Sequence, residues 1–216
     1  MSQTLDICPE ALKLKHPFTF IVSGPTQSGK TFFVFKLLEN LSKITDPPIF
    51  EIVYIYNAWQ EGFNKYKNRV FFTNDLKYLK IRPKNPTLIV CDDFMSQIGK
   101  NKDMFNLFIR DSHHNGVSIV LILQNIFEKD LIGYRRNTHY YYLTEHLQDR
   151  RSIEHFARQL EPKNSKYFMK SYEDATSYPF GGLFIDVHPH STLRLISKYR
   201  TGIHQFKGQV LYIPEK

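Results

Sequence analysis

Gly24-Pro25-Thr26-Gln27-Ser28-Gly29-Lys30-Thr31 matches the phosphate-binding pattern G-x-x-x-x-G-K-[ST] at every fixed position. A continuous apolar run, residues 18–22, comes directly before this stretch, and a helix-like pattern, residues 31–41, follows it. The pattern indicates a phosphate-binding P-loop only where it lies between a strand and a helix, and the sequence predicts both. We therefore expect residues 24–31 to bind the phosphates of a nucleotide.

The residue types of this stretch suit phosphate chemistry. Its glycines allow a tight turn that points successive backbone N–H groups at phosphate oxygens, and the start of the following helix adds positive potential. We expect Lys30 to reach the β- and γ-phosphates of ATP and Thr31 to ligate Mg²⁺. An ordinary glycine-rich turn would explain the two glycines, but not Lys30, Thr31 and both flanking patterns together.

Composition limits the class of protein. With 42% hydrophobic and 15% aromatic residues the chain is globular, and 216 residues suit a single domain over residues 1–216. No apolar run is long enough to cross a membrane and the first residues do not resemble a signal peptide, so we expect an intracellular protein. Cys8 and Cys91 lie far apart, which favours a reducing compartment without structural zinc. The net charge of +8 suits either a polyanionic partner or simple solubility.

Apolar strands alternate with helical patterns along the chain. The expected strands are residues 18–22, 50–56, 87–91, 117–123 and 138–143, and the expected helices are residues 31–41, 101–112, 148–160 and 164–177. Residues 1–16 are a lead-in, and residues 178–216 are a C-terminal β-ribbon and tail, with ribbon strands at 183–187 and 193–197. The alternation predicts an α/β fold with a mainly parallel central sheet flanked by helices.

Two acidic residues, Asp92 and Asp93, follow the strand at residues 87–91. An apolar strand that ends in carboxylates has the form of the second NTPase motif, Walker B. Asp92 would hold Mg²⁺ beside Thr31, and Asp93 would orient or deprotonate the attacking water. Two aspartates that cap a turn would be the simpler interpretation without the P-loop. Its presence favours the catalytic one.

Gln124 ends the next buried strand, residues 117–123. In P-loop NTPases of the additional-strand type, a polar residue at this point contacts the γ-phosphate or the attacking water. We therefore expect Gln124 to act as a sensor, although glutamine is also a common turn residue. Arg135 and Arg136 keep open the alternative of an arginine lid that closes over a donor nucleotide, as in small-molecule phosphotransferases.

Six stretches follow one another in a specific order: residues 92–93 (DD), 112–119 (SHHNGVSI), 124–127 (QNIF), 137–140 (NTHY), 157–162 (ARQLEP) and 179–186 (PFGGLFID). Together they resemble the viral genome-packaging ATPases of the FtsK–HerA superfamily. The resemblance is to the poxvirus type, especially in Maverick/Polinton-like elements and adintoviruses. It covers about residues 18–195, and the order of the stretches is much more specific than the P-loop alone.

This resemblance implies a motor that uses ATP and Mg²⁺ to pump double-stranded viral DNA into a preformed capsid. It also implies a homo-oligomeric ring that docks on the capsid or its portal vertex, with an arginine finger from the neighbouring subunit at each ATP site. We favour Arg135 or Arg136 as this finger over the other candidate arginines, which are Arg110, Arg150, Arg151 and Arg158. Many relatives have Gly-Arg-His where this chain has Asp111-Ser112-His113-His114, so no finger is assigned there. The expected location is the infected host cell, in a virus factory or the nucleus, or the virion.

Two basic segments are candidates for contact with DNA in the pore of the ring, residues 97–102 and residues 77–84, and solubility explains their charge equally well. Binding through phosphates would be sequence-independent and salt-sensitive. His113 and His114 lack ligand partners at suitable spacing, which favours capping or packing over metal binding. The run Tyr140–Tyr142 favours packing in a sheet over stacking on bases.

Two further functions remain open besides the motor. One is a P-loop phosphotransferase or another DNA-dependent ATPase or helicase-like protein. The other is a structural subunit that binds ATP without hydrolysing it.

Overall fold

The centre of the molecule is a mostly parallel β-sheet. The computed structural model describes residues 12–94, 101–191, 198–202 and 210–213. The strands of the sheet within these residues are β2 (Thr19–Ser23), β4 (Glu51–Tyr56), β5 (Phe71–Thr73), β6 (Thr87–Asp92), β7 (Val117–Leu123), β8 (Tyr140–Thr144), β9 (Gly182–Asp186), β10 (Tyr199–Arg200) and β11 (Leu211–Tyr212). They lie in the order β11-β10-β9-β8-β2-β7-β6-β4-β5. The strands from β8 to β5 are parallel to one another, and β9, β10 and β11 extend the sheet with antiparallel pairing.

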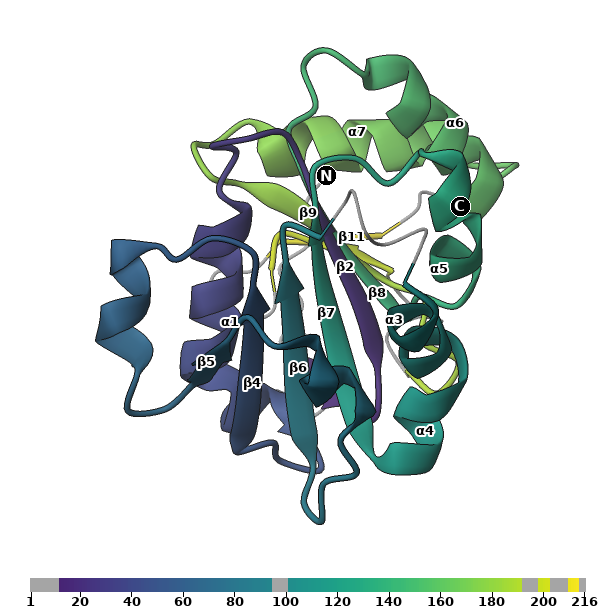
Figure 1. Ribbon diagram of the computed structural model, residues 1–216. Coiled ribbons are helices and arrows are strands. Elements are labelled where there is room, and N and C mark those ends of the chain that lie inside the picture. Colours follow the sequence, from purple (N-terminus) through teal and green to yellow (C-terminus); the bar gives the residue numbers. More distant parts are fainter. Residues whose placement is uncertain (1–11, 95–100, 192–197, 203–209, 214–216) are drawn as a thin grey trace.

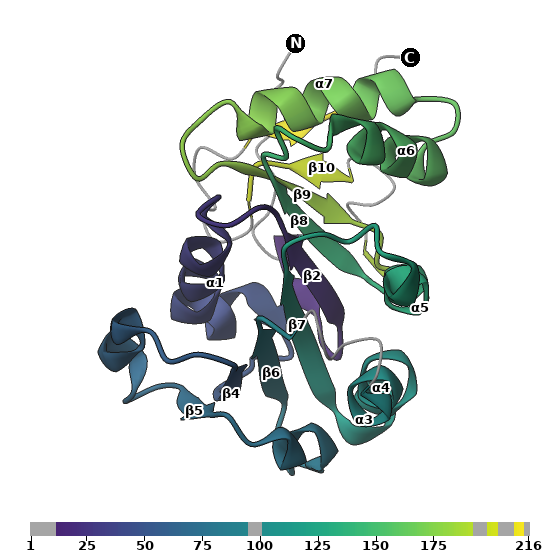
Figure 2. The same cartoon turned by 45° about the horizontal axis from the view of Figure 1, so that its top comes forward.

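Helices cover both faces of this sheet. They are α1 (Lys30–Ile44), α3 (Lys102–Asn106), α4 (Ser112–Asn115), α5 (Ile132–Arg136), α6 (Arg150–Leu160) and α7 (Ser165–Thr176). Helix α1 packs on one face, whereas α3 to α7 pack on the other (Figures 1 and 2). A short parallel pair, β1 (Leu14–Lys15) and β3 (Thr45–Asp46), lies outside the main sheet.

Burial on both faces explains why the central strands are continuously apolar. In β2, Phe20 and Val22 join the core on the side of α1, and Ile21 between them joins the core on the side of α3 to α7. A strand that alternated apolar with polar residues would place polar side chains in one of these two cores. The predicted α/β fold with a mainly parallel sheet flanked by helices is therefore confirmed.

Most predicted elements lie where the pattern put them. Strand β7 occupies the predicted residues 117–123, and the ends of the other central strands differ by one or two residues. The helix predicted over residues 101–112 is divided, because a π-helical turn at Leu107–Asp111 separates α3 from α4. The described partner of β9 on its outer side is β10, while the predicted ribbon strand at residues 193–197 lies outside the described residues.

Regular structure also occurs where none was predicted. Residues 57–86 contain the edge strand β5 and 3-10 helices at Glu61–Tyr66 and Leu76–Lys80, and α5 follows a further 3-10 turn at Lys129–Leu131. These elements are three to six residues long, too short for a period of two or of 3.6 to become visible in the sequence. Phe63 holds the first of these segments to the core, because its ring stacks on Phe72 with centroids 4.9 Å apart.

The tyrosine run in β8 packs in the sheet, as predicted. Tyr140, Tyr141 and Tyr142 are all at most 3% exposed. The Tyr142 ring stacks on Phe33 of α1 at a centroid distance of 3.5 Å, and Tyr141 contacts Phe156 of α6 on the other face at 5.1 Å. These rings tie helices from both layers to the same strand.

Four histidines gather near the start of β8. The His139 ring lies 4.5 Å from His188 and 5.3 Å from His113, and the His190 ring lies 5.7 Å from His188. The Nδ1 atom of His139 accepts a hydrogen bond from the backbone N–H of Thr19 at 3.2 Å, which requires an unprotonated nitrogen. Burial, and then the charges that His188, His113 and His190 would carry, lowers the pKa of His139 to about 3.

Stability should therefore fall in mild acid. The unfolded chain binds a proton at His139 below about pH 6.5 and the folded chain does so only near pH 3. The stabilisation is complete above pH 6.5 and is lost as the pH falls towards 3. We expect the free energy of unfolding, measured with urea, to drop by on the order of 1–2 kcal/mol between pH 7 and 5. His139→Asn keeps an acceptor for Thr19 but does not titrate, so its drop should be smaller. Equal drops in both proteins would contradict this assignment.

Candidate nucleotide-binding site

The P-loop connects β2 to α1 and leaves no room for larger residues at its two fixed glycines. Gly29, which precedes α1, has a φ of 95°, in the left-handed region that glycine adopts without strain. A Cβ atom on Gly24 would lie only 1.7 Å from the Thr144 hydroxyl at the end of β8. The same hydroxyl donates to the Ser28 hydroxyl at 2.6 Å. Strand β8 therefore supports the loop from one side, a role of Thr144 that the sequence pattern did not reveal.

Lys30 lies over the loop. Its ammonium donates hydrogen bonds to the backbone carbonyl oxygens of Gly24 and Pro25, each at 2.7 Å. Burial lowers the pKa of Lys30, and the negative charges of Asp92 and Asp93 oppose this effect. The two carboxylates are thus close enough to act on the ammonium. Lys30 can exchange its carbonyl acceptors for the oxygens of a phosphate bound in the loop.

Asp92 is the last residue of β6 and is buried, with 7% of its surface exposed. Its Oδ2 atom accepts a hydrogen bond of 2.6 Å from the hydroxyl of Tyr54, which lies in the neighbouring strand β4. Burial raises the pKa of Asp92, and the hydrogen bond from Tyr54 and the charge of Lys30 act against this rise. Tyr54 therefore holds one carboxylate oxygen of Asp92 and stabilises its ionised form. No sequence pattern marks Tyr54 as part of the site, because only the pairing of β4 with β6 brings it to Asp92.

Asp93 and Gln124 are exposed at the same edge of the sheet. Asp93 follows β6 directly and has a φ of 63°, a conformation that aspartate tolerates better than most residues. Gln124 follows the last residue of β7, and β7 lies between β2 and β6. The carboxyl ends of these three parallel strands therefore bring the P-loop, the acidic pair and Gln124 together. The expected additional strand between the two NTPase motifs is β7.

The residues at this edge fit a magnesium ion that is bound together with phosphates. Mg²⁺ prefers oxygen ligands and in phosphate sites takes only one or two from the protein, with water and phosphate oxygens supplying the rest. The Asp92 carboxylate and the Thr31 hydroxyl, in the first turn of α1, provide such oxygens. Among the described residues no group of three or more His, Cys, Asp or Glu is arranged to hold a metal on its own.

Arg135 and Arg136 lie away from this edge. They end α5, and Asn137, the next residue, accepts a hydrogen bond at its carbonyl from the hydroxyl of Thr19 at the start of β2. Because the P-loop follows the last residue of β2, the first residue, Thr19, lies at the opposite edge of the sheet. The Arg135 guanidinium lies over the Phe127 ring at 5.8 Å. These two arginines are therefore not part of the candidate site of their own chain.

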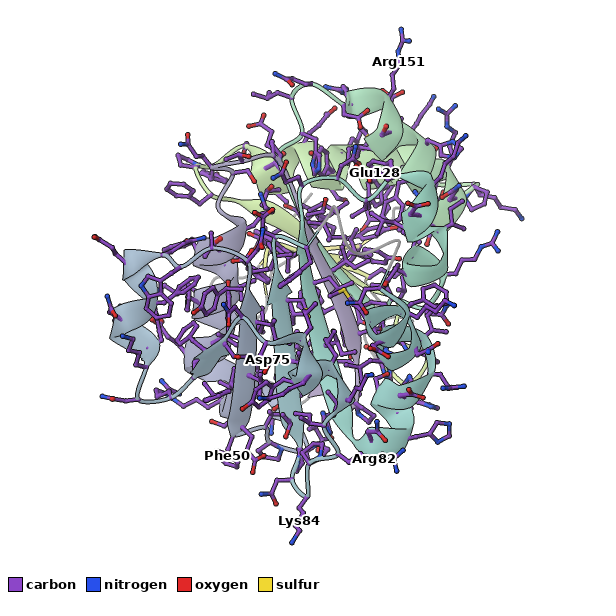
Figure 3. The ribbon with its side chains drawn as sticks, viewed as in Figure 1. Phe50, Asp75, Arg82, Lys84, Glu128 and Arg151 are labelled. Carbon is purple, nitrogen blue, oxygen red and sulfur yellow. The ribbon has the colours of Figure 1, made fainter. Side chains whose placement is uncertain are left out.

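The other arginines considered as fingers, and the two histidines, differ in whether they form ion pairs. Arg150 pairs with Glu173 and Arg110 pairs with Asp111, whereas Arg151 extends from α6 into solvent (Figure 3). His113 and His114 are exposed near the end of α4.

Of the two basic segments, residues 97–100 lie outside the described residues. In the other, Lys77 pairs with Asp75 and Lys80 pairs with Asp103, which reduces the charge available to DNA.

The loop between α7 and β9, residues 177–181, also belongs to this site. A Cβ atom on Gly29 would lie 2.9 Å from the Cβ atom of Phe180, so this loop packs directly on the P-loop. In the sequence, residues 179–186 contribute to the family resemblance, and no role in the site was predicted for them. Its Gly181-Gly182 pair is the signal that could have indicated a close approach between two backbone segments.

Replacing Tyr54 by phenylalanine tests the support of Asp92. Tyr54→Phe removes the hydrogen bond that favours the carboxylate, so the pKa of Asp92 should rise further above its ordinary value. The variant should also lose about 1–3 kcal/mol of folding free energy, because a buried carboxylate oxygen loses its partner. A ¹³C NMR titration of the aspartate carboxyl groups measures the first effect and urea unfolding the second. Tyr56→Phe, in the same strand, is the control, and an Asp92 titration that is the same in both variants would exclude this role.

Comparison with known proteins gives structural relatives only. No protein-family model matches the chain, and no curated protein matches it significantly. The fold is similar to that of B204, the DNA-packaging ATPase of Sulfolobus turreted icosahedral virus, with a TM-score of 0.56 and 12% identity over 80% of this chain and 94% of B204. B204 of Sulfolobus turreted icosahedral virus 2 in complex with AMPPCP gives a TM-score of 0.57 at 11% identity, over 84% and 94% of the two chains.

A second kind of relative comes from secretion. The cytoplasmic domain of EccC, the type VII secretion ATPase of Thermomonospora curvata, has a TM-score of 0.53 at 14% identity, over 90% of this chain and 25% of that one. No helix in the described part of the chain has the length and apolar character of a membrane span. The chain therefore shares the fold of the packaging ATPase B204 and of part of EccC, as the resemblance to packaging ATPases predicted.

Proposed function

We propose that this chain is an ATP-driven motor that moves double-stranded viral DNA into a preformed capsid. The observation that carries this proposal is the gathering of Lys30, Asp92, Asp93 and Gln124 at one edge of the sheet around the P-loop. The fold likeness to B204, described as a DNA-packaging ATPase, supports the choice of a packaging motor among P-loop functions.

Binding of ATP uses the P-loop. The backbone N–H groups of residues 24–31 and the start of α1 attract the phosphates, and Lys30 moves from its carbonyl acceptors to the β- and γ-phosphate oxygens. Asp92 and Thr31 would hold Mg²⁺, which when bound neutralises charge on the phosphates. The hydrogen bond from Tyr54 keeps Asp92 ionised and oriented for this contact.

Hydrolysis uses the two exposed residues at the edge. Gln124 orients a water molecule in line with the γ-phosphorus, and Asp93 accepts a proton from it as the water oxygen attacks. The bond between the γ-phosphorus and the bridging oxygen breaks, and ADP leaves. Positioning and charge stabilisation supply most of the acceleration in such phosphoryl transfers.

A homo-oligomeric ring would complete the site with an arginine from a neighbouring subunit. Arg135 and Arg136 remain the proposed fingers, and their distance from the site of their own chain agrees with action on another subunit. The ring would act in the infected cell or in the virion and would dock on the capsid or its portal vertex. DNA would pass through the pore and be held by its phosphates.

Two substitutions test the catalytic assignment. Lys30→Ala should abolish nucleotide binding or turnover, because the main positive charge of the loop is lost. Asp93→Asn should bind ATP normally while the hydrolysis rate falls by about 10²–10⁴-fold, since the amide cannot accept the proton. Calorimetry measures binding and phosphate release measures turnover. Normal turnover in Asp93→Asn would show that another group acts as the base.

DNA should stimulate hydrolysis without regard to sequence. We expect long double-stranded DNA to raise steady-state ATP hydrolysis by the wild type, and Asp93→Asn to show no such increase. Affinity for two unrelated duplexes should be equal and should fall by about a hundredfold or more between roughly 50 and 200 mM salt. Strong preference for one duplex, or stimulation by a small phosphate acceptor instead of DNA, would count against a motor. If DNA alone has no effect, the assay is repeated with empty capsids.

A further inference from the structure

A pocket opens beside the P-loop, on the side away from Asp92. It has a volume of about 470 Å³ and is lined by residues 25–28, by Glu145 and Leu147 after β8, and by residues 176–181 between α7 and β9. Ligand pockets for small molecules begin at about 300 Å³, so this one can hold a nucleobase with part of its sugar. We propose that this pocket binds the purine base of the nucleotide and that Phe180 and Tyr178 are its aromatic contacts. The proposal rests on the nucleotide binding of the proposed function.

The order of the strands sets the direction in which a bound nucleotide extends. Strands β7 and β6, with Gln124 and Asp92, lie on one side of β2, and β8 and β9 lie on its other side. A triphosphate in the P-loop that turns its γ-phosphate towards Asp92 must extend its sugar and base towards β8 and β9. That is the side on which the pocket lies. The P-loop and the loop before β9 also run side by side in Figures 1 and 2.

The pocket presents apolar side chains to solvent. Tyr178 is 72% exposed, Phe180 is 58% exposed and Leu147 is 80% exposed. Large apolar side chains exposed together next to a polar site are a common sign of a ligand surface. A purine has two flat faces that stack on aromatic rings, and the surrounding Thr26, Ser177 and Glu145 can meet its polar edges.

Backbone and ring contacts fix the position of Phe180. Its backbone has a φ of 60°, which is uncommon for a bulky residue and is a feature that clusters at ligand sites. The Tyr142 hydroxyl donates to the Phe180 carbonyl at 3.4 Å, and the Gly181 N–H donates to the Tyr178 carbonyl at 2.9 Å. The Phe180 ring also lies 5.7 Å from the ring of Phe32. These contacts hold Phe180 beside the P-loop without filling the pocket.

The test compares a nucleotide with its phosphates alone. Calorimetry measures the affinity of the full-length protein for ATP, GTP and UTP, and for inorganic tripolyphosphate, which has no base. Phe180→Ala should weaken ATP and GTP binding on the order of tenfold, because an aromatic contact with the base is lost, and should leave tripolyphosphate binding unchanged. UTP, with its smaller ring, should lose less. Tyr178→Ala should also weaken ATP and GTP binding. Phe180→Tyr, which keeps an aromatic ring, should retain wild-type affinity.

Phe50→Ala is the matched control. Phe50 is an equally large side chain, 75% exposed, and lies at the far end of the sheet from the P-loop (Figure 3). The proposal is overturned if Phe180→Ala leaves ATP binding unchanged, or if it weakens ATP and tripolyphosphate equally, because Phe180 would then act only by supporting Gly29. A loss for UTP as large as that for ATP would exclude a purine-specific site.

The same measurements distinguish a failure of the proposed motor function from a failure of the base pocket. If the wild type binds ATP in a Phe180-dependent manner but does not hydrolyse it with or without DNA, the base pocket stands and the motor does not. If the wild type binds neither ATP nor tripolyphosphate, both proposals fall.

Discussion

The close approach of three chain segments is the constraint on which the site depends. The P-loop touches the end of β8 at Gly24 and the loop before β9 at Gly29, and in both places a Cβ atom would collide with its neighbour. Gly181 also has no room for a side chain, since an added Cβ atom would lie 2.5 Å from the carbonyl oxygen of Ala175. The phosphate loop is thereby held by residues more than 100 positions away in the chain.

These segments can approach so closely because the sheet beneath them is packed on both faces. Aromatic side chains fill the core on the side of α1, where Phe33 stacks on Tyr142 and Phe20 meets Phe184 at 5.7 Å. A close-packed interior of this kind transmits strain instead of absorbing it. The strand ends therefore stay in register, and the polar residues that follow them keep fixed positions at the edge. The rigid sheet is therefore what keeps the exposed, charged residues at its edge in place.

Sequence reasoning succeeded where the pattern was local and strong. The strand and helix on either side of residues 24–29, and the strands ending near Cys91 and Leu123, lie where their apolar runs predicted them, because parallel strands buried on both faces must be apolar throughout. It failed for residues 57–86 and for α5, whose elements are only three to six residues long. It also missed Tyr54 and Thr144, which reach the site through strand pairing and contact residues far away in the sequence.

The sequence by itself determined the kind of fold and the chemical groups of the candidate site: a glycine-rich loop with a lysine, two carboxylates and an amide, each at the end of a predicted strand. It could do so because these groups are specified by neighbouring residues. Only the tertiary structure decided which side chains support them, which side of the P-loop carries the pocket, and that Arg135 and Arg136 lie apart from it. Those facts depend on the order in which strands associate across the sheet, and no spacing along the chain encodes that order directly.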